Sequence, residues 1–483
     1  MSDVIRQLEP TALWTHFAAL NAVPRPSKKE TKVIAFIRKF GEDLKLETLE
    51  DAVGNVIIRK PATKGKEDRP TIVLQSHLDM VHQKNAATQF DFDKEGIRMV
   101  LDKDWVSADG TTLGADNGIG VAAIMALLGS TDIPHPPLEA LFTIDEETGM
   151  TGAMALEGGL LHGKYMLNLD TEDDRELTIG CAGGVDVTAT GIYPIEHVPA
   201  GSSAFRLGVT GLTGGHSGMD IHLGRGNANK LMNRLLHEAT SKLGLRVASM
   251  DGGSLRNAIP RESFSIVLVP DSQEAGLRKL ISNQTRILQE EYKKTDPGLQ
   301  IQLEPADLPD GLMSDEFHAD LLRAIYACPN GIHRMSPDID GLVQTSNNLA
   351  RVIAGEGKYT VMCLTRSSVE SEKFDLAEAI RSTFELVGAD VAFEGSYPGW
   401  TPRPEAAIVT LMTKLYKDLY KEEPHVNACH AGLECGILGQ NYPKMEMISF
   451  GPNIRGAHSP DEKVQVSSVQ KFWQFLTTTL DRI

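Results

Sequence analysis

Five short segments, spread over most of this sequence, contain His, Asp and Glu residues that are candidate metal ligands. Glu146 and Glu147 stand side by side in the run 141–149, Leu-Phe-Thr-Ile-Asp-Glu-Glu-Thr-Gly. Comparable segments hold His77 with Asp79 (Ser-His-Leu-Asp), Asp116 (Gly-Ala-Asp-Asn-Gly), Asp170 (Asn-Leu-Asp) and His458 (Gly-Ala-His-Ser-Pro). A single His or Asp is more often a helix cap or a hydrogen-bonded core residue. As a set, five of these groups supply the imidazole and carboxylate ligands of a zinc pair, with one carboxylate able to bridge the two ions.

Two carboxylates remain beyond the five ligands, and hydrolysis needs both. Asp79 comes two residues after His77, so on a strand both side chains point to one face and Asp79 can orient the imidazole. Glu146 lies next to the ligand Glu147 and can take a proton from the attacking water. The seven residues therefore predict a two-metal hydrolase.

The segments before these residues indicate how they are positioned. Short apolar runs at 71–75, 139–143 and 165–169 read as strands, and each ends near a candidate ligand. In open α/β sheets, ligands gather beyond the carboxyl ends of the strands. The apolar run 119–128 predicts a buried helix that follows Asp116. Ser27 and Glu30 have the spacing of a capping box at the start of an amphipathic helix.

The pattern changes near residue 187 to alternating strands separated by amphipathic helices near 227–243, 271–292, 314–328 and 369–386. The order is close to βαββαβ with an additional helix-containing portion. A turn-rich segment near 395–402 closes this region. We therefore expect an α/β protein with a doubly wound, mixed-sheet catalytic domain in two parts, 1–186 and 399–483, and an inserted α+β domain at 187–398 that is ferredoxin-like and enlarged.

The composition limits the classes of function. A chain of 483 residues is long enough for two domains, and 48 basic against 65 acidic residues give a net charge of −17. This excess argues against nucleic acid or an anionic membrane as the partner. The sequence has no run of about 18 apolar residues and no secretory leader pattern. Five cysteines without a C-x-x-C pair fit a reducing cytoplasm.

These segments, in this order, resemble the zinc-site segments of the co-catalytic metallopeptidase superfamily that includes carnosinases, bacterial tripeptidases and glutamate carboxypeptidases. The resemblance extends over the whole chain and implies that the inserted domain is the lid of that family. It implies that one metal takes His77 and Asp170, that the other takes Glu147 and His458, and that Asp116 bridges them. It further implies Glu146 as general base, Asp79 behind His77, and a cis peptide between Asp116 and Asn117. The expected ions are two Zn²⁺ per chain, with Co²⁺ or Mn²⁺ as alternatives.

The lid segment from Gly211 to Gly218 resembles the lid motif of the family, so His216 is expected to stabilise the tetrahedral intermediate. In relatives this imidazole often reaches across a dimer interface, and we expect a homodimer here too. The sequence leaves open whether His216 acts in the active site of its own chain or in that of the partner chain. If the substrate is an unblocked dipeptide, the site must bind its two charged termini. Arg366 can hold a carboxylate as a fork, Asn257 and Asn348 can assist by hydrogen bonding, and Glu434 can meet the free amine.

We therefore expect a cytoplasmic dipeptidase for unblocked dipeptides of broad sequence, including those that end in histidine. The alternative within the same chemistry is a deacylase or carboxypeptidase that acts on N-acyl substrates. A metal-binding protein without turnover is disfavoured because all seven positions are filled. A dinuclear phosphohydrolase is disfavoured because no basic phosphate clamp accompanies the ligands.

Overall fold

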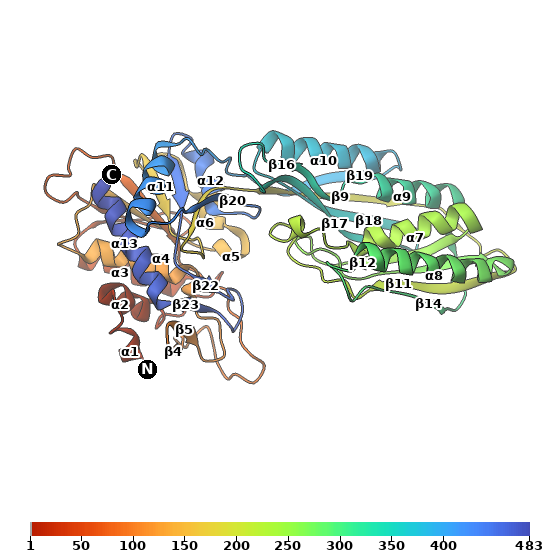
Figure 1. The fold of residues 1–483 in the computed structure, drawn as a ribbon, viewed down its shortest axis with the longest axis horizontal. Coiled ribbons are helices and arrows are strands. Elements are labelled where there is room, and N and C mark those ends of the chain that lie inside the picture. The colour runs from red at the N-terminus through yellow and green to blue at the C-terminus, as the bar shows by residue number, and fades with distance from the viewer. Residues whose placement is uncertain (1) are drawn as a thin grey trace. The chain divides into compact units, whose positions relative to one another are not determined.

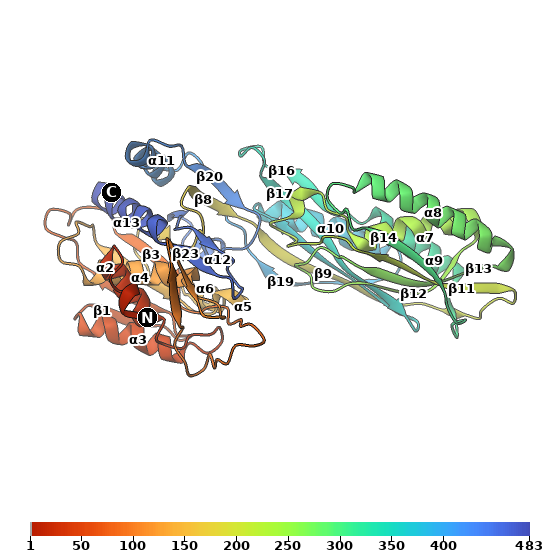
Figure 2. The ribbon, with the colours of Figure 1, turned by 60° about the horizontal axis from the view of Figure 1, so that its bottom comes forward.

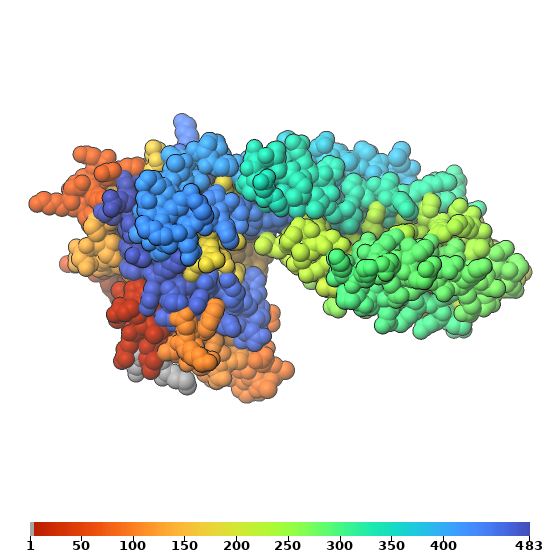
Figure 3. Space-filling model, in the orientation of Figure 1, coloured from red at the N-terminus to blue at the C-terminus, as the bar shows by residue number. Residues whose placement is uncertain are grey.

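The computed structural model describes residues 2–483, whose internal contacts divide the chain into two compact units. Unit 1 consists of Met1–Gly180, Trp400–Ala428 and Leu433–Ile483, and unit 2 consists of Cys181–Gly399 and Cys429–Gly432. In Figure 3, the early segments of unit 1 (red to orange) and its late segments (blue) lie side by side on one surface. The division falls close to the domain limits expected at 186 and 398, which stay a prediction.

Unit 1 is built on an eight-stranded mixed sheet. Its strand order is β1-β2-β6-β3-β7-β21-β8-β20. The strands are β1 (Glu47–Glu50), β2 (Val56–Lys60), β3 (Ile72–His77), β6 (Leu138–Thr143), β7 (Tyr165–Asn168), β8 (Glu176–Cys181), β20 (His425–Cys429) and β21 (Glu446–Ser449). The four central strands β6, β3, β7 and β21 run parallel, so their carboxyl ends share one edge of the sheet. This confirms the expected mixed α/β architecture.

Unit 1 also contains nine described helices, some of which contact the sheet directly, as α4 contacts β3 and α11 contacts β21, and several of them are visible around it in Figure 1. They are α1 (Ser2–Ile5), α2 (Thr11–Leu20), α3 (Thr31–Asp43), α4 (Ala115–Gly129), α5 (Glu146–Gly149), α6 (Thr151–Ala155), α11 (Ala407–Tyr420), α12 (Glu434–Asn441) and α13 (Val466–Arg482). A small second sheet has the order β22-β23-β5-β4, formed by β22 (Ile454–Arg455), β23 (Lys463–Gln465), β5 (Trp105–Ala108) and β4 (Met99–Asp102). None of the described helices is long and apolar enough to cross a lipid bilayer.

Helix α4 is buried over most of its length, as its apolar sequence predicts. Its residues from Asn117 to Leu128 are buried, and the helix contacts α2 on one side and β3 on the other. A helix that is apolar all round must find partners on every face. Its amino-terminal end is thereby held against the strand that carries His77.

The capping box expected at Ser27 and Glu30 is wrong. Helix α3 begins at Thr31 with Glu30 as its N-cap, and no side chain caps it. The Ser27 hydroxyl donates instead to the Asp79 carboxylate, at 2.7 Å between the oxygens. A charged acceptor brought close by the tertiary fold makes a stronger hydrogen bond than a neutral one.

Unit 2 holds a nine-stranded antiparallel sheet with the order β14-β11-β13-β12-β17-β18-β9-β19, to which β16 adds beside β17. Its strands are β9 (Gly183–Ile192), β11 (Ser202–Thr210), β12 (Arg246–Gly253), β13 (Ser263–Pro270), β14 (Gln300–Pro305), β16 (Gly331–Met335), β17 (Val343–Gly355), β18 (Lys358–Ser367) and β19 (Asp390–Tyr397). A separate ribbon pairs β10 (Ile195–Glu196) with β15 (Leu312–Met313). The sheet and its helices share one large apolar core.

Four long helices form one layer in unit 2 and lie beside one another in Figure 1; Figure 2 gives a second view of the unit, turned by 60°. They are α7 (Ala228–Leu243), α8 (Glu274–Glu291), α9 (Asp315–Ala327) and α10 (Glu370–Glu385). Helix α7 contacts both α8 and α9, and α9 contacts α10, so the four lie in one continuous layer. The short 3₁₀ helices η1 (Ile221–Leu223) and η2 (Asp271–Gln273) complete the unit.

The strand order shows that the enlarged inserted domain contains the βαββαβ arrangement twice. One copy runs β11-α7-β12-β13-α8-β14, and the other runs β9-α9-β17-β18-α10-β19. From the shared β12–β17 pair outward, each copy places its second, third, first and fourth strands in that order. The first copy is inserted between β9 and α9 of the other, so the additional portion expected from the sequence belongs to a second βαββαβ copy.

Candidate active site

Parallel strands in unit 1 bring the candidate metal ligands to one edge of the sheet. His77 is the last residue of β3, Asp170 follows β7 by two residues, and Glu146 and Glu147 open α5 just after β6. Asp145, between β6 and α5, has the left-handed conformation at φ +54°, which turns the chain sharply at that edge. The sequence predicts this clustering, because the carboxyl ends of parallel strands lie at the same edge of a sheet.

The candidate ligands form two groups that share Asp116. His77, Asp116 and Asp170 offer ligand atoms within 4.8 Å of one another, and so do Asp116, Glu147 and His458. Oδ1 of Asp116 lies 3.1 Å from Nε2 of His77, whereas Oδ2 lies 3.3 Å from Nε2 of His458. The two oxygens of one carboxylate thus face two different imidazoles. The Asp116–Asn117 peptide is cis, as the resemblance implies.

The charges of this cluster fit divalent cations. Hydrogen bonds to Asp116 and Glu147 raise the pKa of His458 to about 11, so the imidazole acts as a cation among carboxylates. Burial acts to lower the pKa of His77, yet neighbouring carboxylates, Asp170 first, hold it well above its usual value. Oε1 of Glu147 is buried without a hydrogen-bond partner among the described residues. Surplus negative charge and an orphaned carboxylate oxygen are what a pair of divalent ions would satisfy.

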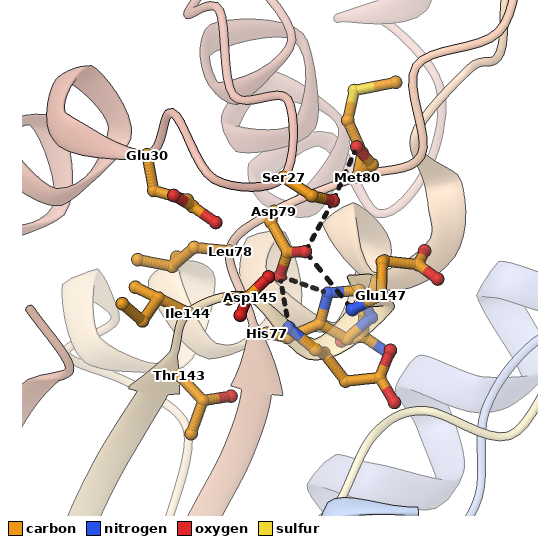
Figure 4. A network of polar contacts seen from close by, with 12 residues as sticks. Ser27, Glu30, His77, Leu78, Asp79, Met80, Thr143, Ile144, Asp145 and Glu147 are labelled. Carbon is orange, nitrogen blue, oxygen red and sulfur yellow. Dashed lines mark hydrogen bonds and ion pairs between the residues drawn. The ribbon is translucent and has the colours of Figure 1, made fainter. Parts of the chain in front are cut away.

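Asp79 lies at the centre of a hydrogen-bond network next to the ligands (Figure 4). It is fully buried, and its Oδ1 lies 3.3 Å from Nδ1 of His77. The backbone amides of Glu146 and Glu147 and the hydroxyl of Ser27 also donate to this carboxylate. Asp79 therefore links the imidazole of His77 to the start of α5, which fixes the imidazole and the adjacent glutamates together.

Glu146 stands beside the ligand groups with a carboxyl group of high proton affinity. Burial raises the pKa of Glu146 well above its usual value, and the carboxylates of Asp170, Glu147 and Glu434 add to that increase. A base of raised pKa holds a transferred proton more firmly. His77, Glu146 and Glu147 also offer polar atoms within 4.8 Å of one another, so the carboxyl group of Glu146 lies within reach of the candidate ligands.

The sequence reasoning missed Glu462, which holds the loop that carries Asp116. Its carboxylate is 2% exposed and accepts four consecutive backbone amides, from Leu113, Gly114, Ala115 and Asp116, at 2.7–3.2 Å. Glu462 lies four residues after His458 in the sequence. No local signal reveals its role, because its partners lie about 350 residues earlier.

The sequence reasoning also missed Arg25, a second buried support of the same loops. Its guanidinium donates to the carbonyl oxygens of Leu78 and Asp79 and to that of Gly114. A Cβ atom at Gly114 or Gly118 would lie 2.5–2.6 Å from its Nη2 atom. The two glycines of the Gly-Ala-Asp-Asn-Gly segment therefore make room for Arg25, which ties the end of β3 to the Asp116 loop.

Glu434 lies in unit 1, at the start of α12. Its Oε2 accepts hydrogen bonds from Nε2 of Gln75 at 2.6 Å and from the hydroxyl of Thr143 at 2.7 Å. Its Oε1 is buried with no partner among the described residues, and burial raises the pKa of Glu434 to about 8. Glu434 thus presents one unsatisfied oxygen that an amine can meet.

The expected lid residues all lie in unit 2, where His216 is held in one tautomer. The backbone amides of Gly218 and Met219 donate to its Nδ1, at 3.1 and 3.0 Å. Nδ1 is therefore the acceptor and Nε2 carries the proton in the neutral ring. Burial, followed by the charge of Arg366, lowers the pKa of His216 to about 4, so the ring stays neutral and donates through Nε2 near pH 7.

Asn348 and Asn257 differ in what they do within unit 2. Nδ2 of Asn348 donates to the carbonyl oxygens of Arg256 and Ala258, which flank Asn257. Asn257 is exposed, and its carbonyl oxygen accepts the amide of Ser217 next to His216. Asn348 therefore supports the Asn257 loop, whereas the side chain of Asn257 faces solvent.

His430 is a further residue that the sequence reasoning missed. It belongs to the short segment of unit 2 at 429–432, and its Nε2 lies 2.7 Å from Oγ of Ser346. Its carbonyl oxygen would lie 2.1 Å from a Cβ atom at Gly218, so the lid motif requires glycine there. Burial, with the charge of Arg366, lowers the pKa of His430 to about 3, so this imidazole is also neutral.

Comparisons with known proteins agree with this geometry. The model of peptidase family M20/M25/M40 matches residues 73–482. The chain is 40% identical over 479 residues to the cytosol non-specific dipeptidase of Escherichia coli, covering 99% of each chain. It is 42% identical to the crystal structure of aminoacylhistidine dipeptidase from Vibrio alginolyticus, with a TM-score of 0.93 and coverage of 100% of this chain and 99% of that one. The aminopeptidase PepT of Bacillus cereus, 16% identical with a TM-score of 0.57 and 98% of each chain covered, shares the fold.

Proposed function

The chain belongs to peptidase family M20/M25/M40, and we propose that it is a metal-dependent dipeptidase acting on dipeptides with free termini. The single observation that carries the metal chemistry is Asp116, whose two carboxylate oxygens face His77 and His458 separately. The specificity rests on the whole-length similarity to two dipeptidases. Broad specificity, with dipeptides that end in histidine among the substrates, is the finer part of the proposal. The name of the Escherichia coli relative also supports a cytoplasmic location.

Two metal ions would be held by five side chains. His77 and Asp170 would hold one ion, Glu147 and His458 the other, and Asp116 would bridge them. When bound, the ions supply Lewis acidity, which polarises the peptide carbonyl and makes water acidic enough to attack near neutral pH. Zn²⁺ fits this ligand set best because imidazole and carboxylate are among its usual ligands, and Co²⁺ or Mn²⁺ are alternatives.

Glu146 would act as the general base. Its carboxylate accepts a proton from the attacking water and passes it to the leaving amine, which converts a poor leaving group into a neutral one. Asp79 would keep the imidazole of His77 and the start of α5 in register through its contacts with both. The hydrogen bonds to Asp79 lower its pKa, although burial opposes this, so Asp79 stays an acceptor.

His216 would stabilise the tetrahedral intermediate as a neutral donor. Two backbone amides fix its Nδ1 as acceptor, which leaves Nε2–H to donate to developing negative charge. Arg366 would bind the substrate carboxylate, and Asn257 would assist by hydrogen bonding. Asn348 would act indirectly by holding the Asn257 loop.

Glu434 favours a dipeptidase over a deacylase for N-acyl substrates. Its buried Oε1 lacks a partner among the described residues, and a substrate ammonium group can satisfy it. An N-acyl group brings no positive charge and would leave the oxygen unsatisfied. Free-amine recognition is therefore the property that separates the two activities.

The test is kcat/KM for a matched set of substrates: a dipeptide, its N-acetyl form, its C-terminal amide and a tripeptide. The protein is first stripped of metal and then supplied with Zn²⁺, Co²⁺ or Mn²⁺. We expect activity only with metal, and hydrolysis of the free dipeptide about 30–150-fold faster than that of the N-acetyl form, because the lost hydrogen bond between the ammonium group and Glu434 contributes about 2–3 kcal/mol. Preference for the N-acetyl form would favour the deacylase, and activity after complete metal removal would contradict metal dependence.

A further inference from the structure

Arg366 is buried in unit 2, and only part of its guanidinium is used within the structure. The residue is 4% exposed, and its Nη1 donates to the hydroxyl of Tyr397 at 2.7 Å. Its Nε is buried and has no hydrogen-bond partner among the described residues. A buried N–H without an acceptor is costly, which indicates that a ligand completes this group.

The strand register explains how Tyr397 reaches Arg366. Arg366 on β18 lies directly opposite Gly184 on β9, and Tyr397 on β19 lies opposite the same glycine from the other side. Directly opposed residues point to the same face of a sheet, so all three share one face. Figure 1 shows β18, β9 and β19 as neighbouring strands. The tyrosine side chain must therefore cross the middle strand to meet the arginine.

Glycine at position 184 makes that crossing possible. A Cβ atom there would lie 2.6 Å from the Tyr397 hydroxyl oxygen and 2.7 Å from two ring carbons. Because no real Cβ atom sits so close, any other residue would displace the ring. Gly184 and Tyr397 together therefore form a support for Arg366 across three strands.

The other side of Arg366 is also occupied. Ser346 on β17 lies opposite Arg366, and the Ser346 hydroxyl contacts Nε2 of His430. The side chain of Arg366 thus lies between Tyr397, which reaches it across β9, and the Ser346–His430 pair on the side of β17. Burial raises the pKa of Tyr397, so its hydroxyl stays protonated and neutral beside the arginine.

We propose that Tyr397 is a positioning residue that sets the specificity of this site for a free carboxylate, by holding Nη1 of Arg366 so that the Nε edge meets the ligand. A carboxylate binds a guanidinium most specifically as a fork along one edge. With Nη1 engaged by Tyr397, the Nε–Nη2 edge is the one presented. The inference rests on the proposed function, because it deepens the role assigned there to Arg366.

The test is a double-mutant cycle of Tyr397→Phe and Arg366→Ala, measured as KM and kcat for a dipeptide and its C-terminal amide. Tyr397→Phe should raise KM for the free dipeptide about fivefold, as expected for one lost hydrogen bond, with kcat nearly unchanged. The KM of the amide should not change. In the Arg366→Ala background, where KM is already raised roughly 10–100-fold, the second substitution should have no further effect.

Two additional variants separate positioning from a general loss of structure. Tyr359→Phe is the matched control, since the Tyr359 hydroxyl also makes one hydrogen bond in unit 2, to the carbonyl of Val387. It should leave KM unchanged. Gly184→Ala should reproduce the Tyr397→Phe effect by displacing the ring. Thermal melting of all variants identifies any that fail to fold.

The outcomes distinguish this inference from the proposed function. An equal effect of Tyr397→Phe in both backgrounds, or an equal effect on the amide, would overturn the positioning role while Arg366 keeps its own. An unchanged KM in Arg366→Ala would overturn the assignment of Arg366 and the inference with it. Absence of dipeptide hydrolysis by the wild-type protein would overturn the proposed function itself.

Discussion

Replacing Glu462 by glutamine should weaken metal binding although no metal ligand is changed. The carboxylate accepts four backbone amides, two at each oxygen. A glutamine has one carbonyl oxygen and can keep one pair of these amides, whereas its own NH₂ group would face the other pair. Two buried N–H groups then lose their acceptor, which costs about 1–3 kcal/mol each. Together they would destabilise the native conformation of the loop by about 2–6 kcal/mol.

That cost falls on the loop that carries Asp116. A loop that leaves its native conformation moves the bridging ligand, and changes to the partners that orient ligands typically lower metal affinity about 10–100-fold. We expect such a loss when metal-free Glu462→Gln protein is titrated with Zn²⁺ in competition with a chromophoric chelator. Amide hydrogen exchange at Leu113–Asp116 should accelerate in the same variant, since these amides lose their acceptor.

Glu139→Gln provides the matched control in the same unit. Glu139 is also buried, and one of its oxygens accepts the amides of His162 and Gly163, which a glutamine carbonyl can retain. The control should lose stability through its contact with Arg59 but keep wild-type metal affinity. The reasoning is refuted if Glu462→Gln binds metal as tightly as the control does and the loop amides stay protected.

Four further outcomes are expected. Glu146→Gln should keep both metals and lose about 10²–10⁴-fold in kcat, while Glu147→Ala should lose one metal by elemental analysis; the reverse pattern would exchange their roles. Asp116→Ala should weaken both metals, and one site left at full affinity would contradict bridging. His216→Ala should lower kcat with both metals bound, and near-normal kcat would exclude the lid imidazole. Because the pKa of His216 is lowered to about 4, the folded state binds fewer protons at this residue than the unfolded state does, and the free energy of unfolding therefore falls as pH falls from about 6.5 to 4. His216→Ala should show a smaller fall over this range, which acid titration of both proteins measures.

The positions of the metal-ligand candidates at strand ends could be predicted from local sequence. Apolar runs that end at His77 or shortly before Glu147 and Asp170 follow from strand periodicity, and parallel strands bring their carboxyl ends to one edge. The burial of α4 followed from an apolar sequence on every face. The clustering of these residues could therefore be inferred from the sequence.

Short-range patterns failed where a distant partner competes. Ser27 and Glu30 have the spacing of a capping box, but Asp79 offers the Ser27 hydroxyl a charged acceptor 52 residues away. The spacing shows only that a local hydrogen bond is possible, whereas the tertiary fold can bring a stronger acceptor to the same hydroxyl. The second βαββαβ copy was recognised only in part for a similar reason, since its first strand, β9, is separated from α9 by the whole of the other copy.

The sequence by itself determined the types of chemistry-bearing residues and the strand ends on which they lie, because these depend on residue identity and local periodicity. Only the tertiary structure decided which groups hold them in place. Glu462 meets the Asp116 loop across about 350 residues, and Tyr397 meets Arg366 only because three strands are in register over Gly184. Such contacts depend on the three-dimensional path of the chain, and residues far apart in sequence carry no periodic signal of their pairing.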